Sequence, residues 1–154
     1  MIKVCFVCLG NICRSPMAEF IMKDIVKKNN LDEKIFIVSR ATSSEERGNG
    51  IYHLAKEKLK EKGIIFDNDK VSTCLEKDDL CKYDYIIGME TKNIINIEKI
   101  LETKDEKIKR ILDYSNNPRD IADPWYTNNF EKTYNDIYEG CQFFLDFLMK
   151  NNIV

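Results

Sequence analysis

An apolar run that ends at a cysteine and is followed by Gly-Asn and Arg-Ser-Pro constrains the fold of this chain more than any other feature. The run covers residues 3–9 and leads into the segment VCFVCLGNICRSPMAEF, residues 4–20. Such a run is typical of a strand buried on both faces of a parallel sheet. Ser15 and Pro16 predict the start of a helix, because serine is a favourable N-cap and proline is tolerated in the first turn. Apolar residues at helical spacing extend this helix to about Lys28, so the N-terminus is expected to form a strand, a tight loop and a helix.

The rest of the chain continues this alternation. Apolar runs predict strands at 35–38, 84–89 and 108–112, and helical periodicity predicts helices at 51–62, 94–101 and 130–150. Strands that alternate with helices favour parallel pairing through right-handed crossovers. The segment 114–129 is dense in Asn, Pro and Asp and is expected to be the longest loop. No repeat or linker interrupts the pattern, so residues 1–154 are predicted to form a single α/β domain.

Charge, hydropathy and cysteine usage narrow the class of protein. The formal net charge of −2 predicts no basic surface for nucleic acid, and no apolar run reaches the ~18 residues of a membrane helix. The six cysteines are expected to be reduced thiols in a cytoplasmic protein, because nothing else indicates secretion. Cys5 and Cys8 form a CxxC pair inside a strand pattern, with no second pair and with His53 as the only histidine, so no metal site is predicted.

The loop from Cys8 to Arg14 has the composition of a phosphate-binding loop. It follows the carboxyl end of a predicted strand, and parallel α/β proteins bind ligands at this edge of the sheet. Backbone N–H groups in such a turn can point inward, next to the unpaired donors of a helix start. Gly10 and Asn11 tolerate positive φ, which a loop that curls around an anion requires. Arg14 can close the ring by binding two phosphate oxygens at once.

The same loop is predicted to place a nucleophile beneath the bound phosphate group. An anion-binding environment favours the thiolate of Cys8, and Ser15 can donate a hydrogen bond to that sulfur. A thiolate beneath a phosphoryl group is placed for in-line attack on phosphorus. A tyrosyl leaving group, with a pKa near 10, also needs a proton donor, and Asp123 in the long loop is the best candidate. Trp125 and Tyr126 beside it can form the walls of a slot for a phenyl ring.

These residues together resemble a known enzyme family. The segment VCLGNICRSP, residues 7–16, is similar to the signature of the low-molecular-weight protein tyrosine phosphatases. The sequence DPWY, residues 123–126, resembles the acid loop of that family, and weaker matches lie at 39–43 and 83–89. The resemblance implies a three-layer, flavodoxin-like fold with a four-stranded parallel sheet flanked by helices. It also implies catalysis without a metal or an organic cofactor.

The resemblance assigns roles to individual residues. Cys8 would be the nucleophile, Arg14 the phosphate clamp and Asp123 the general acid. Ser39 would join the polar network that keeps the loop in shape. Cys13 matches a second loop cysteine that can form a reversible disulfide with the nucleophile, or it is a small loop side chain. The predicted substrate-binding residues are Leu9, Gly10, Asn11, Ile12, Cys13, Ser15, Glu45, Trp125 and Tyr126. The expected partner is a phosphotyrosine-containing protein or peptide, and the expected product is inorganic phosphate.

The sequence also departs from the family pattern. Lys70 stands where a histidine is usual, and Thr73 and Cys74 replace an Arg-Gln pair, which leaves the support of Asn11 open. Glu90 replaces an aspartate that usually follows the third strand.

A further departure concerns one wall of the pocket. Glu45 and Glu46 replace an aromatic-polar pair. Their charges should repel acidic substrates and favour basic residues beside a phosphotyrosine.

Three other functions remain open from the sequence. A protein-arginine phosphatase shares the fold but typically carries Thr at the position of Ile12. A thioredoxin-coupled arsenate reductase uses two further cysteines, and Cys74 and Cys81 precede the strand that they would be expected to follow. A non-catalytic phosphate-binding module would not need an acid such as Asp123. The oligomeric state and the physiological phosphoprotein are left undetermined.

Overall fold

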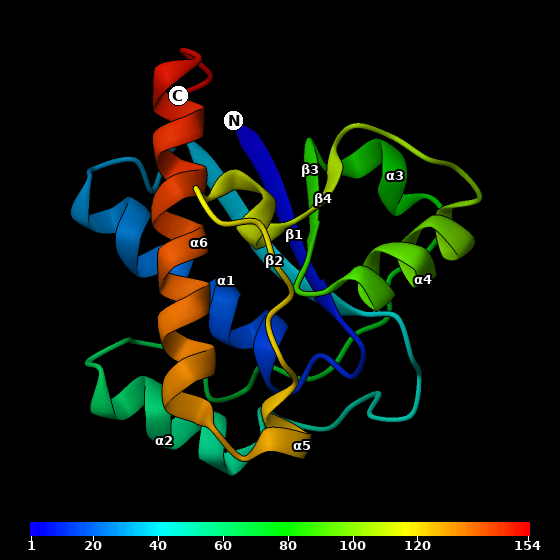
Figure 1. Cartoon of the computed structure of the whole chain (residues 1–154), viewed down its shortest axis with the longest axis vertical. Coiled ribbons are helices and arrows are strands. Elements are labelled where there is room, and N and C mark those ends of the chain that lie inside the picture. The colour runs from blue at the N-terminus through cyan, green and yellow to red at the C-terminus, as the bar shows by residue number, and fades with distance from the viewer.

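The computed structural model describes all 154 residues and contains one four-stranded parallel sheet. Its spatial order is β2-β1-β3-β4, with every neighbouring pair parallel. The strands are β1 (Ile2–Cys8), β2 (Ile35–Ala41), β3 (Tyr85–Gly88) and β4 (Ile108–Arg110). This arrangement, visible in Figure 1, confirms the predicted α/β fold with a four-stranded parallel sheet.

Helices cover both faces of the sheet and complete three layers. The helical elements are α1 (Arg14–Lys28), α2 (His53–Glu61), α3 (Asp79–Lys82), α4 (Thr91–Leu101), the 3-10 helix η1 (Ile111–Tyr114), α5 (Pro124–Thr127) and α6 (Phe130–Lys150). Helix α1 packs on β1, β2 and α6, whereas α4 packs on β1, β3 and β4 (Figure 1). None of the helices combines the length and the apolar character needed to cross a bilayer.

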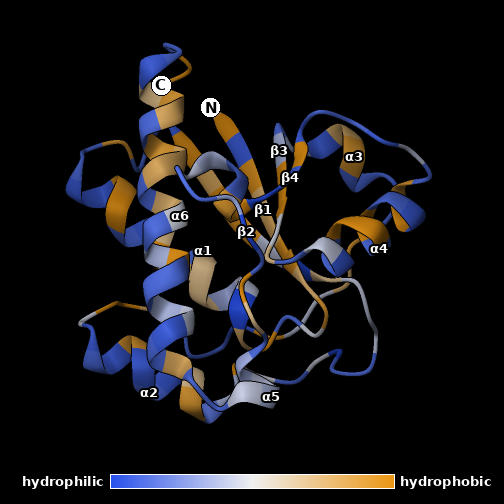
Figure 2. Cartoon of the chain, viewed as in Figure 1, coloured by the Kyte–Doolittle hydropathy of each residue, from blue (hydrophilic) through white to orange (hydrophobic).

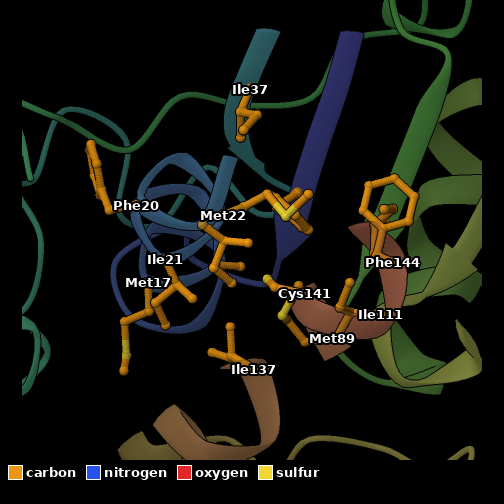
Figure 3. Close-up of a cluster of buried hydrophobic side chains, with 14 of the residues drawn as sticks. Met17, Phe20, Ile21, Met22, Ile37, Met89, Ile111, Ile137, Cys141 and Phe144 are labelled. Carbon is orange, nitrogen blue, oxygen red and sulfur yellow. The ribbon is translucent and has the colours of Figure 1, made fainter. Parts of the chain in front are cut away.

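The core lies on both sides of β1, because alternate residues of a strand point to opposite faces. Val4 and Phe6 belong to the larger apolar cluster, between the sheet and α1 and α6, while Cys5 and Val7 belong to a smaller one under α4. Figure 3 shows side chains of α1 and α6 among those that make up the larger cluster. Figure 2 shows why both clusters form, since the strands are largely hydrophobic and α6 alternates apolar and polar residues.

Several element boundaries differ from the sequence-based expectation. Helix α1 begins at Arg14 with Cys13 as its N-cap, so the prediction that Ser15 caps this helix is wrong. The hydroxyl of Ser15 lies 3.1 Å from the sulfur of Cys8 and is used there. The last strand ends at Arg110, because the chain turns into η1, and the long loop 114–129 contains the short helix α5. Helix α6 has the predicted bounds.

The packing of α6 against η1 predicts the effect of one substitution. A Cβ atom at Gly140, inside α6, would lie 2.6 Å from Cγ1 and 3.4 Å from the carbonyl carbon of Ile111. We expect Gly140→Ala to lower the free energy of unfolding by about 1–3 kcal/mol, although alanine favours helices over glycine. Urea denaturation measures this change, with the exposed Asp146→Ala in the same helix as a control that stays within about 0.5 kcal/mol. A Gly140→Ala variant as stable as the wild type would contradict the close contact between these elements.

Candidate active site

The loop between β1 and α1 turns its peptide N–H groups toward a common centre. Four of its carbonyl oxygens, those of Cys8, Leu9, Gly10 and Ile12, are bonded outward. They accept from Thr42 N–H at 3.0 Å, Ser43 N–H at 2.9 Å, the Ser72 hydroxyl at 2.7 Å and Tyr52 N–H at 2.9 Å. Because N–H and C=O of a planar trans peptide point to opposite sides, these contacts direct the intervening N–H groups inward.

The inward N–H groups divide into two sets. Those of Asn11 and Ser15 donate to the sulfur of Cys8, at 3.3 and 3.4 Å. The others make no hydrogen bond within the protein: Leu9, Gly10, Ile12, Cys13 and Arg14. A concave group of free N–H donors next to the first turn of α1 is an anion-binding site.

Cys8 lies at the base of this loop with three donors around its sulfur. Besides the two N–H groups, the Ser15 hydroxyl oxygen lies 3.1 Å from Sγ. That oxygen accepts from Asn11 Nδ2 at 2.7 Å, so the Ser15 proton can go to the sulfur or to the carbonyl of Arg40, 3.4 Å away. Hydrogen bonds to the sulfur and the positive end of α1 both stabilise negative charge there.

Cys13 is in a different environment in the same loop. Burial raises the pKa of its thiol, and the neighbouring charge of Cys8 acts in the same direction. Cys13 therefore stays protonated, while both cysteines are free thiols in the structure. The reversible disulfide between them stays a prediction.

Asn11 holds the loop in shape from below. Its φ of 57° lies in the left-handed region, which asparagine tolerates better than most residues. Its Nδ2 donates to Ser39 Oγ at 2.9 Å, and its Oδ1 accepts from Thr73 N–H at 3.2 Å. Gly10 does not adopt a positive φ, contrary to expectation. Glycine is suited there because a Cβ would lie 3.3 Å from the Glu46 side chain.

The support of Asn11 survives the departures from the family pattern. Ser39 donates to Glu19 Oε1 at 2.5 Å, and Lys70 Nζ lies 3.7 Å from the same oxygen. Lys70 also donates to the carbonyl of Ser39 at 2.9 Å. Burial lowers the pKa of Lys70, although Glu19 opposes this effect. Thr73 contributes only its backbone N–H, which almost any residue would supply.

Arg14 spans the far side of the loop and is almost fully buried. Its Nη1 donates to the Glu90 carboxylate and, at 2.9 Å, to the carbonyl of Ile121. Its Nη2 donates to Asp123 Oδ2 at 3.3 Å. Glu90 was not predicted as a site residue. It is a charged residue two positions after β3, at the same sheet edge as Cys8, and this position was the available signal.

Asp123 and the two aromatic residues beside it form the opposite wall. Asp123 caps α5, and its Oδ1 accepts from the N–H of Trp125 at 3.0 Å. Trp125 and Tyr126 are 54% and 79% exposed, so their rings border the opening. The ring of Trp125 packs on Tyr52, with centroids 4.9 Å apart. Tyr52 was missed, and its only signal was an aromatic residue just before α2.

A pocket of about 220 Å³ joins these parts. Its lining residues are Cys8, Leu9, Gly10, Ile12, Cys13, Arg14, Ser43, Glu45, Glu46, Asp123, Trp125 and Tyr126. Ten of these were predicted site residues. The predicted Asn11, Ser15 and Ser39 are buried outside this lining, where they form the supporting network.

The remaining ionisable residues differ in whether they line this pocket. Glu45 and Glu46 form no ion pair, so one wall carries unneutralised negative charge. Cys74 and the exposed Cys81 do not line the pocket. No group of three or more His, Cys, Asp or Glu side chains is arranged to hold a metal ion.

Comparison with known proteins shows a close match over nearly the whole chain. Residues 3–153 match the family model described as low molecular weight phosphotyrosine protein phosphatase. The chain is 40% identical to the low molecular weight protein-tyrosine-phosphatase YfkJ of Bacillus subtilis, over 97% of each chain. It is 38% identical to PtpA of Staphylococcus aureus, over 98% of this chain and 96% of PtpA.

Solved structures give the same result. The crystal structure of YfkJ superimposes with a TM-score of 0.94, covering 98% of this chain and 96% of YfkJ. The low molecular weight protein tyrosine phosphatase SP-PTP of Streptococcus pyogenes is 44% identical, with a TM-score of 0.85, covering 97% of this chain and 93% of that one.

The two roles of Asn11, left-handed backbone and hydrogen-bond hub, can be separated experimentally. Asn30 has the same φ of 57° but is exposed and remote from the pocket. We expect Asn30→Ala to lower the free energy of unfolding by about 1 kcal/mol and to leave kcat/KM unchanged. Asn11→Ala should also lower kcat/KM for an aryl phosphate by about 10²-fold, because the N–H donors and Ser15 lose their alignment. Equal kcat/KM values for the two variants would contradict the role of Asn11 as a hub.

Proposed function

The chain belongs to the low molecular weight phosphotyrosine protein phosphatase family, and we propose that it hydrolyses phosphotyrosine in proteins or peptides through a phosphocysteine at Cys8. The observation that carries this proposal is the cup of five free N–H groups above a sulfur that already receives two N–H bonds. A cup of this kind stabilises a phosphate dianion and the developing charge of a phosphoryl-transfer transition state.

Substrate binding would use both the loop and the aromatic wall. The phosphate oxygens accept from the free N–H groups, and Arg14 turns from the Glu90 and Asp123 carboxylates to bind two oxygens. The phenyl ring lies between Ile12 on one side and Trp125 and Tyr126 on the other.

The first chemical step transfers the phosphoryl group to the enzyme. The thiolate of Cys8 attacks phosphorus, a sulfur–phosphorus bond forms, and the bond from phosphorus to the phenolic oxygen breaks. Asp123 donates its proton to that oxygen, so that tyrosine leaves as a neutral phenol. Arg14 and the loop N–H groups hold the equatorial oxygens in the transition state.

The second step returns the enzyme to its starting state. A water molecule attacks phosphorus of the phosphocysteine, and the ionised Asp123 accepts a proton from it. The sulfur–phosphorus bond breaks, and inorganic phosphate forms. Ser15, 3.1 Å from the sulfur, stabilises the departing thiolate through its hydroxyl.

The other functions that the sequence left open have less support. Ile12, rather than threonine, lines the pocket next to two aromatic residues, which favours a phenyl ring over phosphoarginine. The arsenate reductase reaction needs two further cysteines near Cys8, and Cys74 and Cys81 do not line the pocket. Asp123 beside the anion site, bonded to Arg14, favours catalysis over simple phosphate binding.

We also propose that residues 1–154 act as a single phosphatase domain, since both apolar clusters pack on the same sheet. Six free thiols are consistent with a cytoplasmic location. Glu45 and Glu46 on the pocket wall favour phosphotyrosine with basic neighbours in the substrate sequence.

Covalent catalysis predicts a large effect of a one-atom change. Cys8→Ser replaces the nucleophilic sulfur by a hydroxyl of similar shape, and we expect kcat for a phosphotyrosine peptide to fall by more than about 10⁴-fold. Cys13→Ser is the matched control in the same loop and should retain most of the activity. The wild type should hydrolyse a phosphotyrosine peptide faster than the corresponding phosphoarginine peptide. Equal rates for the wild type and Cys8→Ser would exclude the covalent mechanism, and preference for phosphoarginine would overturn the substrate assignment.

A further inference from the structure

We propose that Asp120 is a positioning residue for the general acid, because it anchors the loop that carries Asp123 to the sheet and to α4 independently of Arg14. This inference rests on the proposed function, in which Asp123 protonates the leaving group. Asp120 lies three residues before Asp123 and does not line the pocket around Cys8.

A single oxygen of Asp120 joins two rigid elements. Oδ1 accepts from the N–H of Thr91 at 2.8 Å and from its hydroxyl at 2.9 Å, at the first residue of α4. The same oxygen accepts from Arg110 Nη1 at 2.9 Å, at the last residue of β4. Burial opposes ionisation of Asp120, but the bonds from Arg110 and Thr91 outweigh it, and the pKa of Asp120 is lowered.

Arg110 is itself fixed in place on the other side. Asp113 accepts from its Nε at 3.0 Å and from its Nη2 at 2.7 Å. The guanidinium therefore presents Nη1 to Asp120 in a defined direction, as planar ion pairs of arginine do. Asp113 makes no contact of this kind with the loop that carries Asp123, so its loss should weaken the anchor only through Arg110.

The segment 120–123, which leads to the general acid, is held by two sets of contacts that respond differently to substrate. In the first set, Arg14 donates to the carbonyl of Ile121 and to the carboxylate of Asp123. In the second set, Asp120 bonds Thr91 and Arg110, and the N–H of Ile121 donates to the carbonyl of Met89 at 2.9 Å. A phosphate dianion competes for Arg14 and weakens the first set, so the second must keep Asp123 in reach during the reaction.

Side-chain packing supports this loop at Ile121, which is fully buried in the larger apolar cluster, but not at Asp120 and Ala122, which are exposed. A hollow of about 390 Å³ lies between the loop and the start of α4, lined by Lys92, Asn96, Asp120 and Thr127 among others. Ala122, the residue before Asp123, is exposed. Without the anchor, the loop can move into the hollow. A displacement of about 1 Å at a catalytic group can cost about 10²-fold in rate.

The test compares two aryl phosphates that differ in their need for an acid. Phenyl phosphate has a leaving group with a pKa near 10 and depends on protonation, whereas dinitrophenyl phosphate releases a strongly acidic phenol that does not. We expect Asp120→Ala to lower kcat/KM for phenyl phosphate about 10- to 100-fold and for dinitrophenyl phosphate less than about threefold. Asp113→Ala loosens Arg110 but leaves both bonds from Thr91 to Asp120, so it should show a smaller difference between the two substrates than Asp120→Ala.

Double variants distinguish positioning from general loss of structure. In an Asp123→Asn background, Asp120→Ala should cause no additional loss on phenyl phosphate, since the acid that it positions is already absent. Asp120→Asn, which keeps an acceptor for Thr91, should show a smaller loss than Asp120→Ala and provides a second variant if the latter folds poorly.

The outcomes separate this inference from the proposed function. Asp123→Asn can lower kcat/KM much more for phenyl phosphate than for dinitrophenyl phosphate while both Asp120 variants lower the two values equally. In that case the positioning role of Asp120 is overturned, and Asp123 remains the general acid. A full additional loss in the double variant would also overturn the anchor. If Asp123→Asn itself shows no dependence on the leaving group, both the acid assignment and the anchor are overturned.

Discussion

The hydrogen bonds donated to the sulfur of Cys8 are the interaction on which the rest of the site depends. The N–H groups of Asn11 and Ser15 reach this sulfur only because the loop curls back on itself between β1 and α1. The same curl leaves five other N–H groups free to bind an oxyanion. In the proposed mechanism, stabilisation of the nucleophile and recognition of the phosphate are thus two consequences of one backbone conformation.

That conformation is maintained by contacts with neighbouring segments. The carbonyl oxygens of the loop accept hydrogen bonds from the two residues that follow β2 and from Tyr52 and Ser72. Below the loop, Asn11, Ser39 and Glu19 form a connected chain of hydrogen bonds, which Lys70 closes on the outer side. The parallel sheet brings these distant segments to one edge, where they hold so short a loop in place.

The sequence predicted the parts of this structure that depend on local pattern. The apolar run correctly predicted β1, and the helical periodicity correctly predicted α6. The segment from Cys8 to Arg14 connects a strand to a helix, as predicted. The start of α1 was misjudged, because Ser15 is bonded to a sulfur seven residues earlier instead of capping its own helix. Local propensity contains no information on such a contact.

Residues that act across the sheet were harder to recognise. Glu90 pairs with Arg14 from a different strand end, and Tyr52 supports Trp125 from the start of another helix. Lys70 replaces a histidine, yet it supports the same network through a long side chain that reaches Ser39. The importance of each of these residues depends on three-dimensional proximity, which residue type and spacing along the chain do not determine.

Selective alkylation tests whether the sulfur of Cys8 is activated within the anion-binding cup. Cys8 is almost fully buried, whereas Cys81 is exposed. At neutral pH, mass-spectrometric mapping after brief iodoacetate treatment should find Cys8 modified faster than Cys81, and inorganic phosphate should protect Cys8 alone. Faster modification of Cys81, or no protection of Cys8 by phosphate, would show that Cys8 is not an activated thiol in a phosphate-binding site.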